Sequence, residues 1–281
     1  MIGAIFFAAT LALAGTPEED FEVGFDRRGY ERVKNVLITR PLTTPKRTFD
    51  VFVIPTLSTR SPTLESVLRL PQEERNQGAE AGLRLGAKLG LTEDLEVGFT
   101  LPPMLFHDGI VFTGPTVEMT LRFVNVDGFE MGVAGASVLP IGEGFSFEGF
   151  VPMQLRISEA LRLSAAPRVA VLLGNKTTAY TTGTLPITLT AQLAPVLFAR
   201  LQTGVSTLRF EDISIMAGAE IGFTLRGDYG AFADVALGFL FPTLIEERGQ
   251  GSKVVAEHWV VALSGRFYVS LPQDRGEKEK L

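Results

Sequence analysis

Apolar and polar residues alternate with a period of two along most of this chain. Between Ala81 and Leu91 every odd-numbered position is apolar, whereas every even-numbered position is glycine, arginine or lysine. The alternation resumes at Leu95 and returns in segments of about ten residues as far as Leu271. A period of two is that of a β-strand, whose successive side chains point to opposite faces. Strands of this length with one apolar face are typical of a transmembrane β-barrel.

The odd-numbered apolar positions predict twelve strands. The segment 184–211 could also form one long strand, so ten or fourteen strands are alternatives, but the spacing of the connections on either side favours two strands there. We therefore predict an all-β fold, a closed antiparallel transmembrane β-barrel over residues 49–271. The expected strands are 49–55, 79–91, 95–102, 115–125, 129–139, 145–157, 161–173, 184–193, 197–209, 212–225, 231–242 and 254–271.

The connections between these strands alternate between short and long. Bacterial outer-membrane barrels have short periplasmic turns and longer extracellular loops, so both chain ends are expected in the periplasm. The short turns, rich in turn-forming residues, are 92–94, 126–128, 158–160 and 226–230, and the longer connections are 56–78, 103–114, 140–144, 174–183 and 243–253.

The first fourteen residues carry no charge and end in Ala12-Leu13-Ala14. Small residues at alternate positions after an apolar stretch are typical of a secretory signal, so residues 1–14 are expected to be a signal peptide cut after Ala14. A permanent anchor is the alternative, but this stretch is shorter than the roughly 20 residues of a spanning helix. The chain contains no cysteine, which excludes a cysteine-linked lipid anchor, disulfides and thiolate metal sites.

Charge and hydropathy narrow the class further. The chain has 26 basic and 32 acidic residues without a basic block, which argues against nucleic acid as a partner. The mean hydropathy of +0.22 is high for a soluble domain, yet from Gly15 onward no apolar run approaches the length of a membrane helix. A closed barrel explains both observations, because only alternate residues of its strands face lipid.

Two charged segments flank the expected barrel. Residues 15–48 contain seven basic and six acidic side chains and are expected to form either a periplasmic leader or a plug in the lumen, with a disordered leader as the alternative. Residues 272–281 follow Leu271, begin with Pro272 and are expected to be a charged periplasmic tail.

Several segments of the sequence, taken together, resemble those of a known class of membrane protein. The signal-like start, the segment 40–45 (Arg-Pro-Leu-Thr-Thr-Pro) and turn-strand units such as 92–99 are similar to those of the porin-like barrels of Gram-negative outer membranes. The resemblance implies a location in outer-membrane lipid and a channel for small solutes. It equally allows a non-conducting barrel that binds periplasmic or surface proteins of an envelope complex, such as gliding-motility or polysaccharide-export machinery.

The two histidines offer little catalytic chemistry. His107 and Asp108 lie in an expected loop, where an Asp-His pair can activate water, but adjacent loop side chains usually diverge. His258 precedes Trp259 at the expected membrane rim, where amphipathic aromatic residues gather. We therefore expect no enzyme, no cofactor and no metal site.

The charged residues at even positions are the candidate functional residues. A charge that faces lipid costs about 2–4 kcal/mol at the midplane, so these side chains are expected to face the lumen. Either a basic wall faces an acidic wall and selects permeants, or opposite walls pair and fill the bore; a narrow barrel favours the second. The candidates are Arg84, Lys88, Glu96, Glu118, Arg122, Glu130, Glu148, Arg156, Arg162, Arg168, Arg200, Glu220, Asp234 and Arg266.

Hairpin geometry makes these expectations specific. Arg156 should lie directly opposite Arg162, and Glu220 should lie diagonal to Asp234. Glycines at even positions, such as Gly222, should let the wall curve and leave room inside the barrel.

Overall fold

The computed structural model describes residues 37–58, 80–101, 104–106, 110–112, 115–139, 145–173, 179–208, 212–226, 231–248, 251–254 and 259–271. The expected signal peptide, the first part of the leader, His107, Asp108, His258 and the C-terminal tail lie outside these residues. The elements are η1 (Leu37–Thr39), β1 (Thr48–Ser58), β2 (Glu80–Gly90), β3 (Leu95–Thr100), β4 (Met104–Phe106), β5 (Ile110–Phe112), β6 (Thr116–Val126), β7 (Phe129–Val138), β8 (Phe145–Phe150), β9 (Met153–Arg156), β10 (Leu161–Ala165), β11 (Arg168–Leu173), β12 (Ala179–Ala194), β13 (Leu197–Leu208), β14 (Asp212–Arg226), β15 (Phe232–Arg248), β16 (Gly251–Val254) and β17 (Val260–Ser270).

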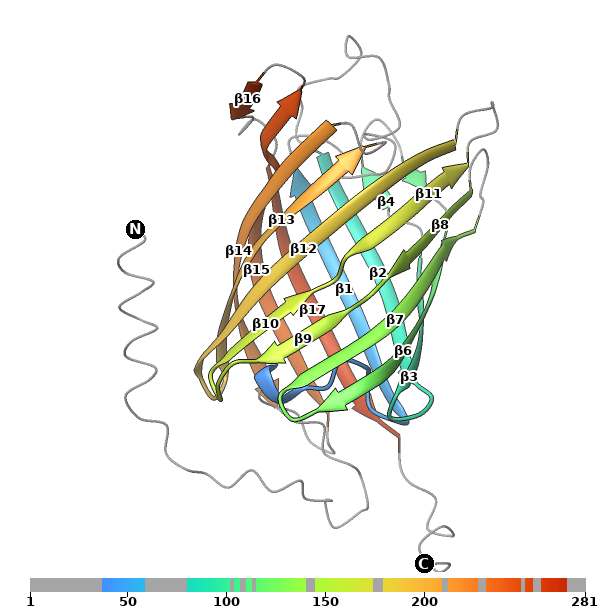
Figure 1. The fold of residues 1–281 in the computed structure, drawn as a ribbon. Coiled ribbons are helices and arrows are strands. Elements are labelled where there is room, and N and C mark those ends of the chain that lie inside the picture. Colours follow the sequence, from blue (N-terminus) through green and yellow to red (C-terminus); the bar gives the residue numbers. More distant parts are fainter. Residues whose placement is uncertain are drawn as a thin grey trace, which may run out of the picture.

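The strands form one antiparallel sheet that closes on itself (Figure 1). Closure occurs at β1, which pairs with β2 on one side and with β17 on the other. The pairs β3/β4, β5/β6, β8/β9, β10/β11 and β16/β17 are each two pieces of one barrel strand, so the described chain makes a closed barrel of twelve strands. This confirms the predicted fold and strand number, including two strands in the ambiguous segment 184–211.

Proline explains why two of the expected strands are interrupted. Because proline has no N–H, it cannot donate to the hydrogen-bond ladder. Pro152 separates β8 from β9, and Pro167 separates β10 from β11. Their carbonyls still accept: Gly132 donates to Pro152 at 2.9 Å and Val151 donates to Pro167 at 3.0 Å. The wall therefore continues through both breaks.

The strands reach further than expected at the ends where the long connections lie. β15 runs to Arg248, and β16 and the start of β12 also occupy segments expected to be loops. Irregular pairing also hides β4, which lies in the expected connection 103–114, because the phase of the alternation changes there. Gly86 pairs with Thr100, but Ala81 pairs with Phe106, so the outward positions change from odd to even within one strand.

The two faces of the wall differ in polarity. Every buried residue of the described strands is even-numbered, and most of them are polar, charged or glycine. The exposed large apolar residues are odd-numbered except for Phe106, Val126 and Val196. Phe106 and Val126 follow register shifts, and Val196 lies in a turn. No helix in the described residues is long and apolar enough to span a bilayer.

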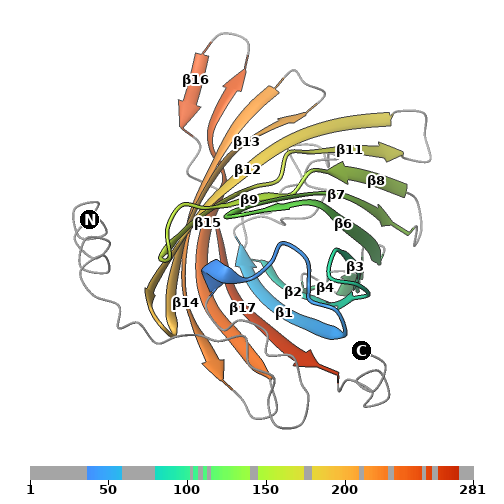
Figure 2. The same cartoon turned by 60° about the horizontal axis from the view of Figure 1, so that its bottom comes forward.

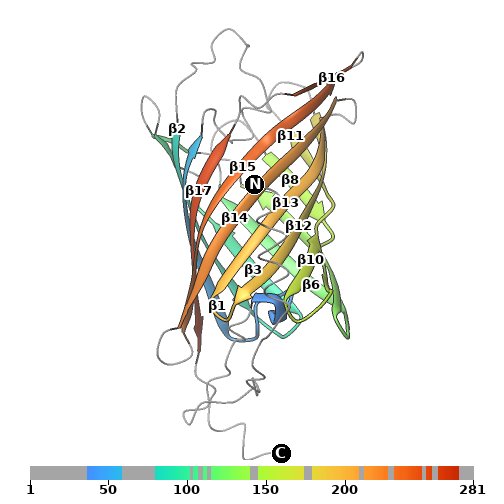
Figure 3. The ribbon, with the colours of Figure 1, turned by 90° about the vertical axis from the view of Figure 1, so that its left-hand side faces the viewer.

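The short turns share one end of the barrel, here called the turn end. Connections 91–94, 157–160 and 195–196 lie there, together with the turn at Gly128, whose φ of 76° favours glycine. β1 begins and β17 ends at the turn end (Figure 1). Figure 3 shows β12 to β15 crossing the wall obliquely, as closure of a sheet into a barrel requires.

Candidate functional site

Residues 37–47, here called the strap, cross the inside of the barrel at the turn end (Figure 2). The strap begins at η1, where Leu37 and Ile38 are buried. Leu37 packs in a cluster with Phe198 and Ala236 of the wall, and its N–H donates to Gln192 at 3.2 Å. Apolar burial therefore holds this half of the strap.

Arg40 is the most heavily bonded residue of the strap. Its guanidinium forms a bidentate, buried ion pair with Asp234 on β15, one contact of which measures 2.9 Å. The hydroxyl of Thr224 donates to the same carboxylate at 2.7 Å. The guanidinium also lies 4.5 Å from the ring centroid of Phe232 and 5.0 Å from that of Tyr268. Removing one partner of such a pair typically costs about 3–5 kcal/mol.

The second half of the strap is held by carboxylates of the opposite wall. The N–H and hydroxyl of Thr44 both donate to Glu96 on β3 at 2.8 Å. The N–H of Leu42 donates to Glu130 on β7. Thr43 is buried, and its hydroxyl donates to the carbonyl of Glu93 at 2.8 Å. The strap is thus bound to both sides of the barrel.

Gly90 lets the strap pass close to the wall. A Cβ at this position would lie 2.0 Å from the carbonyl oxygen of Pro45 and 2.3 Å from that of Thr44. The N–H of Arg47 donates to the carbonyl of Gly90 at 2.8 Å, and Arg47 has a φ of 60°, in the left-handed region. This turn leads the chain directly into β1.

The charged side chains of the wall pair along the circumference. Lys88 on β2 donates to Glu96 at 2.9 Å and to Glu118 on β6 at 2.8 Å. Gly98 lies between Lys88 and Glu118 in the same cross-strand row. Because Gly98 has no side chain, the Lys88 side chain can reach across it to Glu118. Arg122 contacts Glu130 at 3.2 Å. Further described pairs are Arg122–Asp94 at 2.8 Å, Arg168–Glu148 at 3.1 Å, Arg200–Glu220 and Arg266–Asp50.

This arrangement differs from what the sequence favoured. The described wall-to-wall pairs join strands that are neighbours or next neighbours in the sheet, so they do not join opposite walls across the bore. The expected diagonal placement of Glu220 and Asp234 is wrong, because Glu220 pairs in register with Gly238 and Asp234 with Thr224. The sheet pairs Arg226 with Phe232, whereas a turn at 226–230 would have paired residue 225 with residue 231, so the register differs by two residues.

Arg84, Arg156 and Arg162 have no carboxylate within ion-pair distance in the part of the chain that the structure describes. Arg84 lies 5.7 Å from the ring centroid of Phe52 and is exposed to the charges of Arg168 and Arg266 as well as Glu118 and Glu148. Arg156 and Arg162 face each other in register between β9 and β10, as the sequence predicted. These three guanidiniums are therefore not neutralised by a direct ion pair in the described residues, although Lys88 and Arg122 each pair with two carboxylates.

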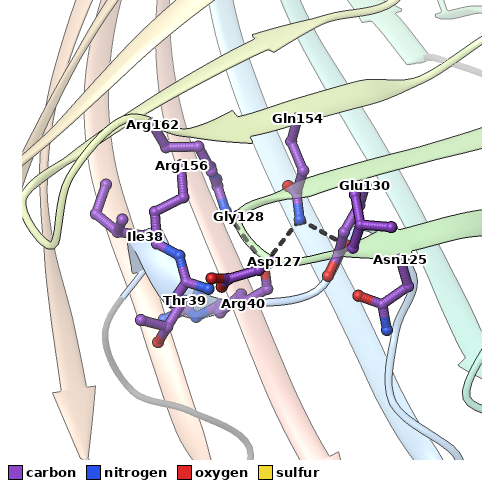
Figure 4. Close-up of a pocket in the computed structure, with 11 residues that line it drawn as sticks. Ile38, Thr39, Arg40, Asn125, Asp127, Gly128, Glu130, Gln154, Arg156 and Arg162 are labelled. Atoms are coloured by element: carbon purple, nitrogen blue, oxygen red, sulfur yellow. Dashed lines mark hydrogen bonds between the residues drawn. The ribbon is translucent and has the colours of Figure 1, made fainter.

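A polar pocket of about 230 Å³ lies between the strap and the β9–β10 hairpin (Figure 4). Gln154 bridges the strap to the wall, since its amide donates to the carbonyl of Arg40 at 3.1 Å and to Glu130 at 2.8 Å. Arg162 donates to the carbonyl of Leu37 at 2.7 Å. Arg156 lines the same pocket. No group of three or more histidine or carboxylate side chains in the described residues is arranged to hold a metal.

Two of the inward glycines, Gly222 and Gly86, do not leave the empty space that the sequence suggested. A Cβ at Gly222 would lie 2.5 Å from Cζ of Phe198, and one at Gly86 would lie 2.2 Å from Cζ of Phe52. Aromatic rings from neighbouring strands therefore lie over these glycines. The sequence reasoning missed both rings and Asp50, although their even positions signal an inward direction.

Comparison with solved structures relates this geometry to known barrels. The KdgM porin in complex with disordered oligogalacturonate aligns with 79% of this chain and 99% of its own, at 7% identity and a TM-score of 0.51. The NanC porin aligns with 76% and 98%, at 8% identity and a TM-score of 0.52. An outer-membrane channel from Pseudomonas putida F1 aligns with 81% and 96%, at 10% identity and a TM-score of 0.53.

The chain has the fold of the porin-like outer-membrane barrels. No protein-family model matches the sequence, and no curated protein sequence matches it. The porin-like fold is therefore established by architecture alone, and what passes through this barrel has to be argued from its own residues.

Proposed function

We propose that the protein is a channel for small solutes in the outer membrane of a Gram-negative bacterium. The observation that carries the proposal is the circumferential pairing of the wall charges, exemplified by Lys88 with Glu118 and Arg200 with Glu220. Pairs of this kind hold long side chains against the wall instead of linking opposite walls. A polar inner face inside an apolar outer face suits an aqueous path across a bilayer.

The unpaired arginines supply the filter of this channel. Rings of charged side chains set the ion preference of a pore. Arg84 has no ion pair in the described lumen, although the charges of Arg168, Arg266, Glu118 and Glu148 all act on it, so its guanidinium is the candidate filter group at this level of the wall. The similar porins support only the general class of channel, since at identities of 7–10% they show a shared fold and no permeant for this chain.

A second candidate function rests on the strap. Because residues 37–47 are bound to both sides of the turn end, a barrel with this strap permanently in place would conduct poorly. In this alternative the protein is a non-conducting barrel that anchors a periplasmic or surface complex. Export by a signal peptide cut after Ala14 belongs to both proposals.

Single-channel recording in a planar lipid bilayer tests the two proposals. The full-length protein is compared with Arg40→Ala, which removes the ion pair to Asp234, and with Lys46→Ala, an exposed strap residue, as control. The channel proposal expects discrete conductance steps that become larger or more frequent in Arg40→Ala and unchanged in Lys46→Ala. Absence of steps in all three folded proteins would overturn the channel and favour the structural barrel.

A further inference from the structure

We propose that the pocket between the strap and the β9–β10 hairpin binds a small oxyanion, a carboxylate or a phosphate, supplied from the solution at the turn end. The proposal does not depend on conduction, because it concerns the mouth of the barrel and not the path through it. The pocket is lined by strap residues 38–40, by the β6–β7 turn, and by Gln154, Arg156 and Arg162 (Figure 4).

The first argument is charge balance. Arg156 and Arg162 are directly opposed across two strands, an arrangement in which like charges repel. The carboxylate of Glu130 is already bound by Arg122, by the amide of Gln154 and by the strap. Two uncompensated guanidiniums therefore face this pocket, and the remaining carboxylate of its lining, Asp127, lies exposed on the turn beyond ion-pair distance of either.

The second argument is the supply of hydrogen-bond donors. Arg162 uses Nη1 on the carbonyls of Leu37 and Arg40, but its Nε is buried and has no acceptor. The side chain of Arg156 makes no hydrogen bond to any residue that the structure describes. Guanidinium groups bind carboxylates and phosphates with paired donors, so an oxyanion between these arginines would use the guanidinium donors of Arg156, which the described residues leave open.

Size and position identify the kind of anion. A volume of about 230 Å³ accommodates a small oxyanion with some water but not a polymer. Gln154, Arg156 and Arg162 occupy even positions, on the face of the wall opposite the apolar outer surface. A lipid headgroup would lie on that outer surface, so the anion is a soluble one. Because Arg162 also holds the strap, anion binding stabilises the docked strap.

Thermal unfolding of the full-length protein in detergent tests the site. Inorganic phosphate and acetate are the probes, each compared with sodium chloride at equal ionic strength. The wild type is expected to show a Tm increase with at least one probe that saturates with concentration, as binding to the folded state alone requires. Arg156→Gln is expected to lose that increase, with a Tm in chloride no lower than the wild type, because the repulsion with Arg162 is relieved.

Arg84→Gln is the matched control, since it removes another unpaired arginine of the wall and is expected to keep the full increase. Phosphate also stabilises proteins without a specific site, so the difference between the variants is decisive. An equal increase in all three proteins, or no saturating increase with either probe in the wild type, would overturn the oxyanion site. Neither result bears on conductance, so failure here is distinct from failure of the channel proposal.

Discussion

At the residue scale, each side chain of the wall faces either the lipid or the lumen. Leu237 is exposed on the outer face, whereas its neighbour Gly238 points inward beside Glu220. Gly238 differs from Gly222, because a Cβ on Gly238 would make only ordinary contacts, the nearest at 3.6 Å. The same substitution at adjacent residues should therefore have opposite outcomes.

We expect Gly238→Arg to fold, with the new guanidinium near Glu220, and Leu237→Arg to fail in assembly. An arginine in lipid costs up to about 2–4 kcal/mol, depending on depth. Heat-modifiable gel mobility reports the folded fraction. If Leu237→Arg folds and Gly238→Arg does not, the assignment of even positions to the lumen is wrong by one residue.

Ion preference is also decided at the level of single residues. Arg84→Glu changes the lumen charge by two units at a residue without an ion pair, so we expect the barrel to fold and the permeability ratio of anions to cations to fall. A change of two charge units, acting on a monovalent ion at about 8 Å in water, amounts to about 1 kcal/mol, or roughly a fivefold change in the ratio. The reversal potential across a salt gradient measures it, and Arg84→Lys, which keeps the charge, should leave it unaltered.

At the scale of elements, the strap is a segment without regular strand structure whose position depends on a few strong contacts. Its hydrogen bonds and ion pair run to side chains of β3, β7, β12 and β15. Arg40 contributes the buried ion pair and two ring contacts, so it dominates this set.

We expect Arg40→Ala to release the strap while the barrel stays folded. Loss of about 3–5 kcal/mol corresponds to a rise in local opening on the order of a hundredfold or more. Hydrogen exchange of peptides that cover residues 37–47 measures this, because Leu37, Leu42 and Thr44 donate backbone N–H groups to the wall.

Two further variants distinguish the loss of the Arg40–Asp234 ion pair from a non-specific destabilisation of the strap. Lys46→Ala should leave the exchange of the strap unchanged, since Lys46 is exposed. Arg40→Ala combined with Asp234→Ala should cost less than the sum of the single changes, because no lone buried charge remains. Unchanged protection of the strap in Arg40→Ala would show that its apolar half alone holds it.

At the scale of the whole molecule, the barrel has two dissimilar ends. The turn end carries the strap and the short turns, and at the opposite end β1 ends at Ser58 and β2 begins at Glu80. Outer-membrane barrels place short turns in the periplasm, which gives the orientation we expect.

Peptide tags inserted within residues 60–78 should therefore react with an external antibody in intact cells, whereas tags at Asp94 or Asp127 should react only after the outer membrane is opened. The segment 243–253, which the sequence would have offered as an insertion site, is unsuitable because it contains the end of β15 and the start of β16. External labelling at Asp94 in intact cells would show that the barrel has the opposite orientation in the membrane.

The sequence by itself determined the barrel, its twelve strands and the polarity of its two faces. These properties follow from local rules: the strand period of two, the turn residues between strands, and the cost of a charge in lipid. Even the pairing of Arg156 with Arg162 could be predicted, because the tight turn between them sets the register.

Only the tertiary structure decided the strap, the circumferential ion pairs and the pocket. Arg40 and Asp234 are 194 residues apart, and Leu37 and Gln192 are 155 apart, so no local pattern relates them. The turn between β14 and β15 displaced Glu220 from Asp234 by two residues, and closure of the barrel brought Asp50 to Arg266. Such contacts depend on register and closure, which the whole sheet sets together.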